Sequence, residues 1–243
     1  GGGRIAVIYD PAEQAALPVP NIIFRVAGGR TNARNIGDLG TLYFPDSRLL
    51  SADTINNFSG QMAWLDAWSA DNVTLTNGWI RFAKDGFSLT ITNNLTVKGS
   101  TTRLDLGGDS YLVSYQAASG VGYPIVSNTP SRYVYNGGTS GVSLHVGKDL
   151  VVTNAASLFV FSSATNSTVG TNFGALVSVA GRAIITSPNS FLYAASHPTN
   201  GGAPLFCTEE LIITTQATFF ASGMGYSMSN GPGRGVSSLR PGG

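Results

Sequence analysis

The residues that could do acid–base chemistry are few and scattered along the chain. Acidic side chains come close together in three short segments: Asp10 with Glu13, Asp105 with Asp109, and Glu209 with Glu210. Enzymes that cleave polysaccharides hold two carboxylates roughly 5–10 Å apart, and some also bind Ca²⁺. For Asp105 and Asp109 the alternatives are a surface Ca²⁺ site and, as we favour, a solvated turn. We therefore expect no catalytic activity and no cofactor.

Histidine and cysteine offer little further chemistry. His145 and His197 are the only histidines, Cys207 is the only cysteine, and no two of them have the spacing of zinc ligands. His145 alternates with Leu144 and Val146, so we expect it to point outward from a strand. Cys207 falls on an expected inward position, where cysteine behaves as a small hydrophobic residue. A single cysteine also excludes an intrachain disulfide.

Aromatic rings and sequons indicate carbohydrate chemistry as the alternative. Tryptophan faces can stack on sugars, and the candidate contacts are Trp64, Trp68 and Trp79, although we favour their packing under a loop as a satellite core. Asn-x-Ser/Thr sequons, the acceptor pattern for N-glycosylation, occur at Asn57, Asn72, Asn94 and Asn166. Glycans at these sites would add the solubility that few surface charges provide.

Composition excludes several classes of protein. Charged residues make up 11% of the 243 residues, glycine accounts for 31 of them, and the net charge is +1. Glutamate and lysine are too rare for a helical bundle, and apolar residues at 42% are too abundant for a disordered chain. The near-zero net charge gives no indication of nucleic-acid binding, and no apolar run reaches the length of a membrane span. We expect one β-rich domain over residues 1–243.

A repeated spacing of apolar residues indicates how the chain folds. The pattern is an apolar pair two residues apart, a three-residue gap, a second pair, a five-residue gap and a third pair. It starts at Leu144, Val177 and Leu205, and at Leu89 with one extra residue in the second gap. Its third pairs are Leu104 and Leu106, Leu158 and Val160, Phe191 and Tyr193, and Phe219 and Ala221.

The repeat predicts a β-solenoid with three short strands per turn. Copies follow one another after 33 and 28 residues, and the 55 residues from Leu89 to Leu144 leave room for two turns. Stacked turns would bury the apolar pairs in one continuous column, while corners such as Gly147-Lys148-Asp149 carry the charges. An antiparallel β-sandwich is the alternative, but it gives no reason for one template to recur in phase.

Two glycine-rich segments, together with the strand template, resemble a known family. The chain begins Gly1-Gly2-Gly3-Arg4-Ile5-Ala6-Val7, and Gly223-Met224-Gly225-Tyr226 precedes Gly231-Pro232-Gly233-Arg234-Gly235 near the other end. These segments are similar to those of the glycine-rich right-handed parallel β-helix proteins of bacterial cell surfaces, which include autotransporter passengers and adhesins. The resemblance implies a right-handed single-stranded parallel β-helix and an extracellular or cell-surface location.

The arrangement of these segments suggests self-assembly. In the family, a segment like 223–235 commonly precedes a segment like 1–7. The end of one copy followed by the start of another would therefore resemble the middle of a longer solenoid. We expect the segment 1–30 to pair with a neighbouring subunit that presents the segment 223–243, giving a head-to-tail fibre. The interface candidates are Arg4, Ile5, Ala6, Val7, Ile8, Tyr9, Tyr226 and Arg234. The alternatives are an adhesin-like module that binds a surface polysaccharide and, less favoured, a polysaccharide-active enzyme.

Overall fold

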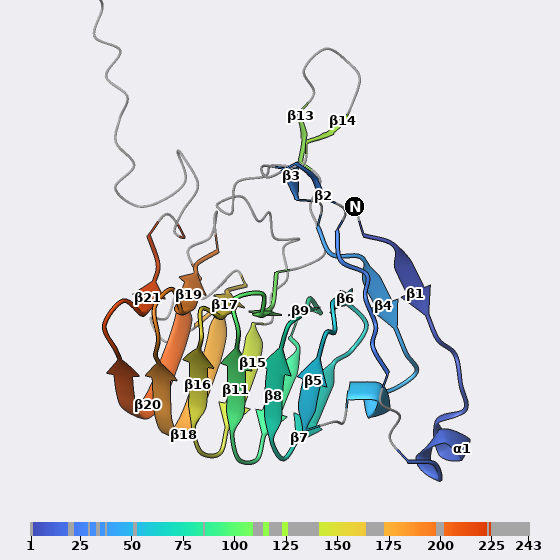
Figure 1. The fold of residues 1–243 in the computed structure, drawn as a ribbon, viewed down its shortest axis with the longest axis horizontal. Helices are drawn as coiled ribbons and strands as arrows, with labels where there is room; N and C mark the ends of the chain where they lie inside the picture. Colours follow the sequence, from blue (N-terminus) through green and yellow to red (C-terminus); the bar gives the residue numbers. More distant parts are fainter. Residues whose placement is uncertain are drawn as a thin grey trace, which may run out of the picture.

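The computed structural model is built mainly from parallel β-strands stacked along one axis (Figure 1). It describes residues 2–18, 22–28, 30–32, 35–36, 38–50, 53–84, 86–108, 114–116, 123–125, 141–163, 173–197, 202–222 and 224. Among these residues, no helix is long and apolar enough to cross a membrane.

Two all-parallel sheets make up the body of the molecule. The first, sheet A, has eight strands in the order β1 (Arg4–Ala6), β4 (Thr41–Tyr43), β6 (Gly60–Met62), β9 (Trp79–Phe82), β12 (Arg103–Leu106), β17 (Ser157–Phe161), β19 (Phe191–Ala195) and β21 (Thr218–Phe220). The second, sheet B, follows the path β5 (Thr54–Asn56), β8 (Val73–Thr76), β11 (Leu95–Lys98), β16 (Leu150–Thr153), β18 (Ala175–Ile185), β15 (Val142–Val146), β10 (Ser88–Ile91) and β7 (Ala67–Ala70), with β20 (Pro204–Ile213) paired to β18.

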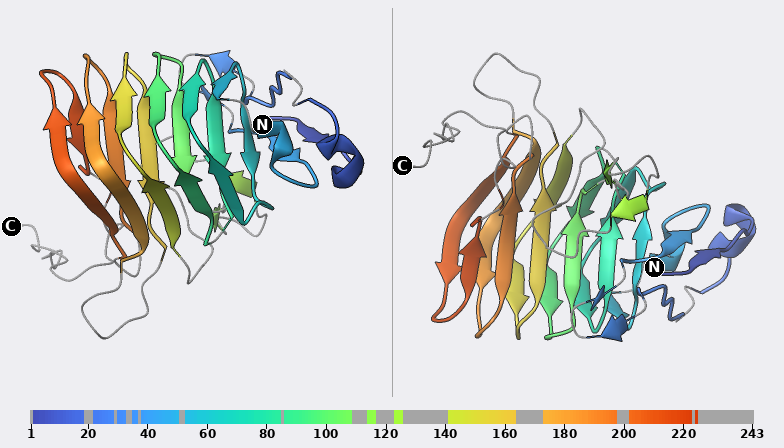
Figure 2. Two further views of the ribbon diagram at one scale, coloured as in Figure 1. Left: turned by 90° about the horizontal axis from the view of Figure 1, so that it is seen from below. Right: turned by 90° about the horizontal axis from the view of Figure 1, so that it is seen from above.

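Sheet B curls back on itself because β18 and β20 are long enough to serve two stacks of strands. Residues 175–179 of β18 pair with β15, and residues 183–185 pair with β16. We call the stack of β7, β10, β15 and the first halves of β18 and β20 arm 1. The stack of β5, β8, β11, β16 and the second halves of β18 and β20 is arm 2. Figure 2 shows the strands of successive repeats side by side along the long axis.

The core lies between these stacks and confirms most of the repeated template. Leu89 pairs with Leu144, Leu95 with Leu150, and Leu104 with Leu158, and all six side chains are buried. Each inward residue therefore rests on its counterpart in the next repeat, as the aligned spacings predicted. The molecule is a parallel, solenoid-like β structure, and the antiparallel sandwich is wrong.

The stretch from Leu89 to Leu144 is one step of the stack and not two. Leu89 and Leu144 are direct neighbours in adjacent parallel strands, so the extra residues form an insertion between β12 and β15. An antiparallel pair, β13 (Ser114–Gln116) and β14 (Tyr123–Ile125), lies within that insertion. The spacing alone did not distinguish a second turn from an excursion of the chain.

Two of the predicted inward pairs have the wrong parity. Leu192 pairs with the buried Leu158 and points inward, so Phe191 and Tyr193 point outward. In β20, Phe206 pairs with the buried Val177, which turns Leu205 and Cys207 outward, and Cys207 is exposed. Both strands carry apolar residues on both faces, so alternation alone could not fix which face is buried.

The corner between arm 2 and sheet A requires an unusual backbone at the same place in successive repeats. Asn57, Asn77, Gly99, Asn154 and Ser187 each follow an arm 2 strand and have positive φ, from 51° to 103°. Asparagine and glycine tolerate this left-handed conformation better than other residues. The corner chemistry thus explains why asparagine recurs along the chain.

The end of the stack that carries β1 is closed by its own side chains. Helix α1 (Pro11–Ala15) begins at Asp10, whose carboxylate accepts the N–H groups of Ala12 and Glu13. A 3₁₀ turn (Arg48–Leu50) lies nearby, and the rings of Phe24 and Phe44 are 4.8 Å apart over the core. The antiparallel strands β2 (Arg30–Asn32) and β3 (Asn35–Ile36) are the remaining described elements of the N-terminal segment.

Candidate functional site

Among the described residues, none covers the opposite end of the stack. Leu211 and Ile213 of β20 pair with Ala183 and Ile185, which are buried, and so occupy inward positions of the last repeat. Nevertheless Leu211 is 46% exposed and Ile213 is 43% exposed, while Phe206 and Phe219 beside them are only partly buried. Within the described chain, β20 pairs only with β18 and β21 only with β19, which leaves two free strand edges.

The N-terminal interface candidates lie on the first strand of sheet A and just after it. Ile5 pairs with Leu42, and Ile5, Val7 and Tyr9 pack partly against the core. The Tyr9 hydroxyl donates a 2.6 Å hydrogen bond to Asp46. Arg4 and Ala6 are exposed, and Ile8 is 84% exposed. Tyr226 and Arg234, the other two candidates, lie outside the described residues.

Exposed large apolar side chains come from the first and the last parts of the described chain. Among described residues they are Ile8, Leu17, Ile22, Ile23, Tyr43, Phe173, Leu211 and Ile213. None of them falls between residues 44 and 172, where β5 to β17 form the middle of the stack. In the last repeat, Leu211 and Ile213 thus place hydrophobic surface where another repeat would stack.

The outer face of sheet A carries a buried ionic network that the sequence analysis missed. Asp105 is fully buried and accepts two hydrogen bonds from Arg103, at 2.6 and 3.0 Å. It also accepts one from Arg81 Nε at 3.1 Å and one from Trp79 Nε1 at 2.8 Å. Arg81 donates further to Asp38 at 2.9 Å and to Gln61 at 3.0 Å. Aligning β9 with β12 by their apolar residues would have placed Arg81 and Asp105 in one outward row.

This network overturns both interpretations offered for the Asp105 segment. Burial raises the pKa of Asp105, but the charges of Arg103 and Arg81 and the bonds from Arg103 and Trp79 more than offset it. The pKa is lowered from its ordinary value of 3.8. Asp105 is therefore an ionised, fully bonded structural carboxylate, and neither a Ca²⁺ ligand nor a solvated turn residue. Asp109 lies outside the described residues.

An aromatic ladder continues the same outward row. Phe159 pairs with Asp105 on one side and with Tyr193 on the other, and the Phe159 and Tyr193 rings stack 3.9 Å apart. Phe220 meets Tyr193 edge-on at 5.2 Å. Arg103 lies over the rings of both Phe159 and Trp79, at 3.8 and 4.5 Å. Because the rings cover each other's faces, this ladder offers sugars little stacking surface.

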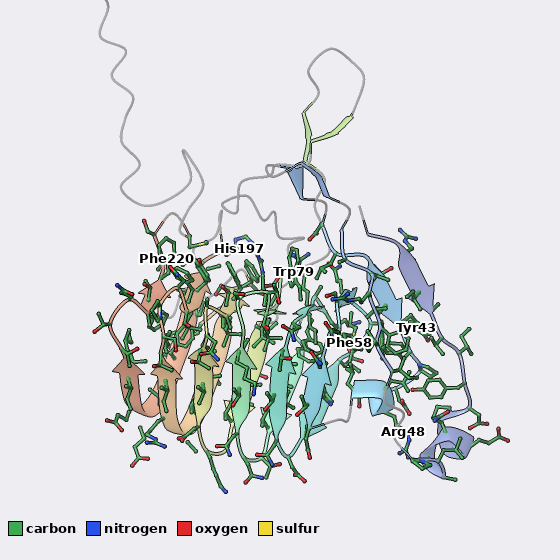
Figure 3. All side chains as sticks on the ribbon, viewed as in Figure 1. Tyr43, Arg48, Phe58, Trp79, His197 and Phe220 are labelled. Carbon is green, nitrogen blue, oxygen red and sulfur yellow. The ribbon has the colours of Figure 1, made fainter. Side chains whose placement is uncertain are left out.

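The three tryptophans do not form one carbohydrate platform. Trp68 is 2% exposed and packs against Phe82 in the core, so it cannot contact a ligand. Trp79 is half-buried beneath Arg103 and Arg81. Trp64 is half-buried at the β1 end, donates from Nε1 to the Leu42 carbonyl, and packs against the exposed Tyr43. Figure 3 shows Trp79 and Tyr43 well apart, with Trp79 on the same side of the stack as His197 and Phe220.

Three of the four sequons lie at corners of the stack. Asn72 is exposed and its Oδ1 accepts the backbone N–H of Asn94, whose own Oδ1 accepts the N–H of Asp149. Asn57 is half-buried and accepts a hydrogen bond from Arg25 at 3.2 Å. Asn166 lies outside the described residues. The Asn72 and Asn94 side chains thus belong to a structural ladder, and their glycosylation remains a prediction.

The same corner ladder continues into the charged corners that the sequence predicted. The Asp149 carboxylate accepts from the backbone of Arg182 at 3.0 Å and from its guanidinium at 2.6 Å. These bonds from Arg182 lower the pKa of Asp149. An open depression of about 500 Å³ lies here, lined by residues that include Lys148, Arg182, Glu209 and Glu210. Its acids and bases alternate between repeats, which favours a solvated corner over a binding site.

The histidines and the cysteine are dispersed as well. His145 is exposed, as predicted, whereas His197 is 4% exposed and burial lowers its pKa. Cys207 was predicted to be inward and is exposed. Within the described ranges, no three His, Cys, Asp or Glu residues come together as a metal site requires.

Comparison with known proteins gives this arrangement no close counterpart. No family model, no curated protein and no solved structure matches the chain. Function must therefore be argued from the surfaces described above, of which the open final repeat is the most distinctive.

Proposed function

We propose that the protein is an extracellular or cell-surface structural protein that assembles head to tail into a fibre, without catalytic activity. In this proposal the stack is a right-handed single-stranded parallel β-helix with three strands per coil, one each from arm 1, arm 2 and sheet A. The handedness follows the general rule that crossovers between parallel strands are right-handed in about 98% of cases.

The open final coil is the observation that carries the proposal. A solenoid repeat cannot bury its inward side chains alone, so an uncapped coil invites another coil to stack on it. Leu211 and Ile213 are already more than half covered, so burying them completely would contribute roughly half of the 1.5–3 kcal/mol of a full side chain, about 0.7–1.5 kcal/mol each. The free edges of β20 and β21 would gain the hydrogen bonds of a continued parallel ladder.

A second copy is the occupant that the two ends favour. Sheet A begins with β1 and ends with β21, and every neighbouring pair between them is parallel. A β21 edge that met β1 of the next subunit would extend the same sheet in the same direction. The exposed Ile8 beside β1 would then meet an apolar surface. Such a heterologous contact repeats and gives a linear polymer.

Charged substitutions in the open coil test the proposal. We expect the wild-type chain to form filaments in negative-stain electron microscopy and concentration-dependent polymers in light scattering. A Leu211→Asp, Ile213→Asp double variant should stay monomeric with an unchanged circular dichroism spectrum, because both side chains are already exposed in the single chain. Leu205→Asp, on the outward side of the same strand, is the matched control and should still assemble.

A substitution at the opposite end tests which surface receives the open coil. Ile8→Asp should block assembly while leaving the fold intact, because Ile8 contributes little burial to the single chain. Mixed with wild type, it should cap growing fibres at one end only. A wild-type protein that remains monodisperse at high concentration would refute the fibre altogether.

An adhesin-like module that binds a surface polysaccharide is the second candidate function. It depends on the Tyr43–Trp64 pair, whose ring centroids are 5.3 Å apart and of which Tyr43 is 45% exposed. Tyr43→Ala should then weaken retention on polysaccharide columns without altering assembly. If Tyr43→Ala and wild type are both unretained, this candidate falls while the fibre proposal stands.

A further inference from the structure

The outward face of arm 2 is more regular than any other described surface of the molecule. Its first row pairs in register from strand to strand: Thr54, Thr74, Thr96, Val151, Ile184 and Ile212. Its second row lies two residues further along each strand: Asn56, Thr76, Lys98, Thr153, Thr186 and Thr214. All six members of the first row are β-branched, and four of the second row are threonine.

Both rows face solvent. Each of the twelve side chains is exposed or half-buried, whereas the residues between them, such as Leu75, Val97 and Val152, are buried. The two rows contain no aromatic and no acidic residue, and Lys98 is their single charge; Arg182 and Glu210 pair two residues before the first row, at the corner. In Figure 1 the strands of arm 2 run side by side along the long axis, with no described element across them.

The other two outward faces lack this order. Arm 1 carries a mixture in its rows, including Ala67, Ser88, His145, Leu176 and Cys207. Sheet A carries the ionic network and the aromatic ladder described above. The regularity of arm 2 is therefore not a general property of the stack, even though threonine is favourable in strands generally.

Backbone geometry converts the two rows into a lattice. Neighbouring strands lie about 4.8 Å apart, and residues two apart on a strand lie roughly 6.6 Å apart. β-Branched side chains hold one preferred rotamer, so methyl and hydroxyl groups recur at fixed positions. Hydrogen bonds fix several of them further, including Thr214 to Thr186 at 3.1 Å and Thr76 to Asn56 at 2.9 Å. Preorganisation of this kind lowers the entropic cost of binding.

A surface that repeats in two dimensions can bind a ligand with a matching two-dimensional repeat, and a crystal face is such a ligand. Crystalline polysaccharides are recognised largely through aromatic rings stacked on sugars, and this face has none. Its chemistry of methyl groups beside hydroxyl groups instead suits ordered water, because hydroxyls can take lattice hydrogen bonds while methyls sit between them. The near absence of charge removes strongly hydrated groups that would disorder that water.

We propose that the arm 2 face binds ice. The hydroxyls of Thr76, Thr153, Thr186 and Thr214 take hydrogen bonds from water molecules of the crystal surface, and the β-branched first row packs against it. Lys98 interrupts the second row and limits the contact. The site is independent of head-to-tail assembly, since it lies on the wall of the stack and not at its ends.

Freezing assays on the full chain test this proposal. We expect wild type to show thermal hysteresis and to inhibit ice recrystallisation. Thr153→Lys should bring both effects down to the level of buffer, whereas Lys98→Thr should increase them by completing the row. Thr90→Lys is the matched control, because Thr90 is exposed on β10 in arm 1, and it should leave both effects unchanged.

Several outcomes would overturn the ice-binding face. One is a wild-type protein with no effect on ice. The others, when circular dichroism shows all variants folded, are a loss of activity in Thr90→Lys as large as in Thr153→Lys, or no gain of activity in Lys98→Thr. Wild-type binding to crystalline cellulose or chitin without any effect on ice would assign the face to polysaccharide instead. Repeating the assay in the Leu211→Asp, Ile213→Asp background separates this result from the fate of the fibre.

Discussion

Asp105 gathers four hydrogen bonds from positively charged or polar donors at a place that water does not reach. Removing one partner of a buried ion pair leaves the other charge uncompensated, which costs about 3–5 kcal/mol. Asp105→Asn should lower the free energy of unfolding by up to this amount in urea denaturation, because Arg81, 3% exposed, would lose one of its two charged acceptors and keep only Asp38. Little or no change would show that the network is dispensable.

The Asp149 pair provides the control for that prediction. Its partner Arg182 is 51% exposed, so solvent and salt screen their interaction. Exposed pairs contribute about 0–1 kcal/mol. Asp149→Asn should accordingly change the free energy of unfolding by less than about 1 kcal/mol. A loss as large as that of Asp105→Asn would mean that the corner ladder stabilises the stack more than an ordinary surface ion pair.

His197 predicts the pH dependence of stability near neutrality. Burial holds the pKa of His197 below its ordinary value of 6.5, so the unfolded chain binds the proton more tightly than the folded one. Stability is therefore present above about pH 6.5 and is lost as the pH falls through the folded pKa. Between about pH 7 and pH 5, wild type should lose more stability than His197→Gln. His145→Gln, at an exposed position, should follow wild type.

At the scale of the strand, the sequence predicted the fold where one face of a strand is clearly more apolar than the other. Val73-Thr74-Leu75 and Leu95-Thr96-Val97 align without ambiguity, because a threonine separates the two apolar residues of each. Phe191-Leu192-Tyr193 does not, because three consecutive apolar residues permit either parity. Only the register with Leu158 shows that Leu192 is inward, and that information comes from a strand 34 residues earlier.

The candidate surfaces were predictable to a different extent. The β1 segment was found through its glycine-rich flank, but the open coil depends on the absence of a covering layer, which no local pattern records. The Asp105 network was missed because its charges lie in different repeats and become neighbours only through the strand register. The rows of arm 2 were missed for the same reason, although the alternation of threonine with valine and leucine was visible in β8 and β11.

The left-handed corners make a prediction about the elements that join the strands. Gly99 has a φ of 103°, a conformation that side-chain-bearing residues rarely adopt. Gly99→Ala should cost about 1–3 kcal/mol of unfolding free energy. Gly3→Ala has open space for its methyl group and an ordinary φ, so it should fall within about 0.5 kcal/mol of wild type. Equal effects would mean that corner strain does not determine stability.

The whole molecule divides its chemistry between walls and ends. Polar corners, a threonine-rich arm and an ion-paired sheet face form the walls, and the exposed large apolar side chains come from the first and the last parts of the described chain. The ends also differ from each other, since aromatic side chains close the core near β1 while no described residue covers the coil of β20 and β21. Two unlike ends are what the proposed head-to-tail growth in one direction requires.

This division predicts how assembly responds to solution conditions. An interface made by Leu211, Ile213 and Ile8 contains no ion pair that salt could screen, so raising the salt from about 0.1 M to about 1 M should leave the fibres intact. Sulfate should strengthen them, and cooling should weaken them, because apolar burial loses driving force at low temperature. Sedimentation of fibres across these conditions provides the measurement. If the fibres dissolve in salt, charged residues lie at the interface instead. Exchanging the charges of Glu210 and Arg4, which lie at the two ends, would then be the first test.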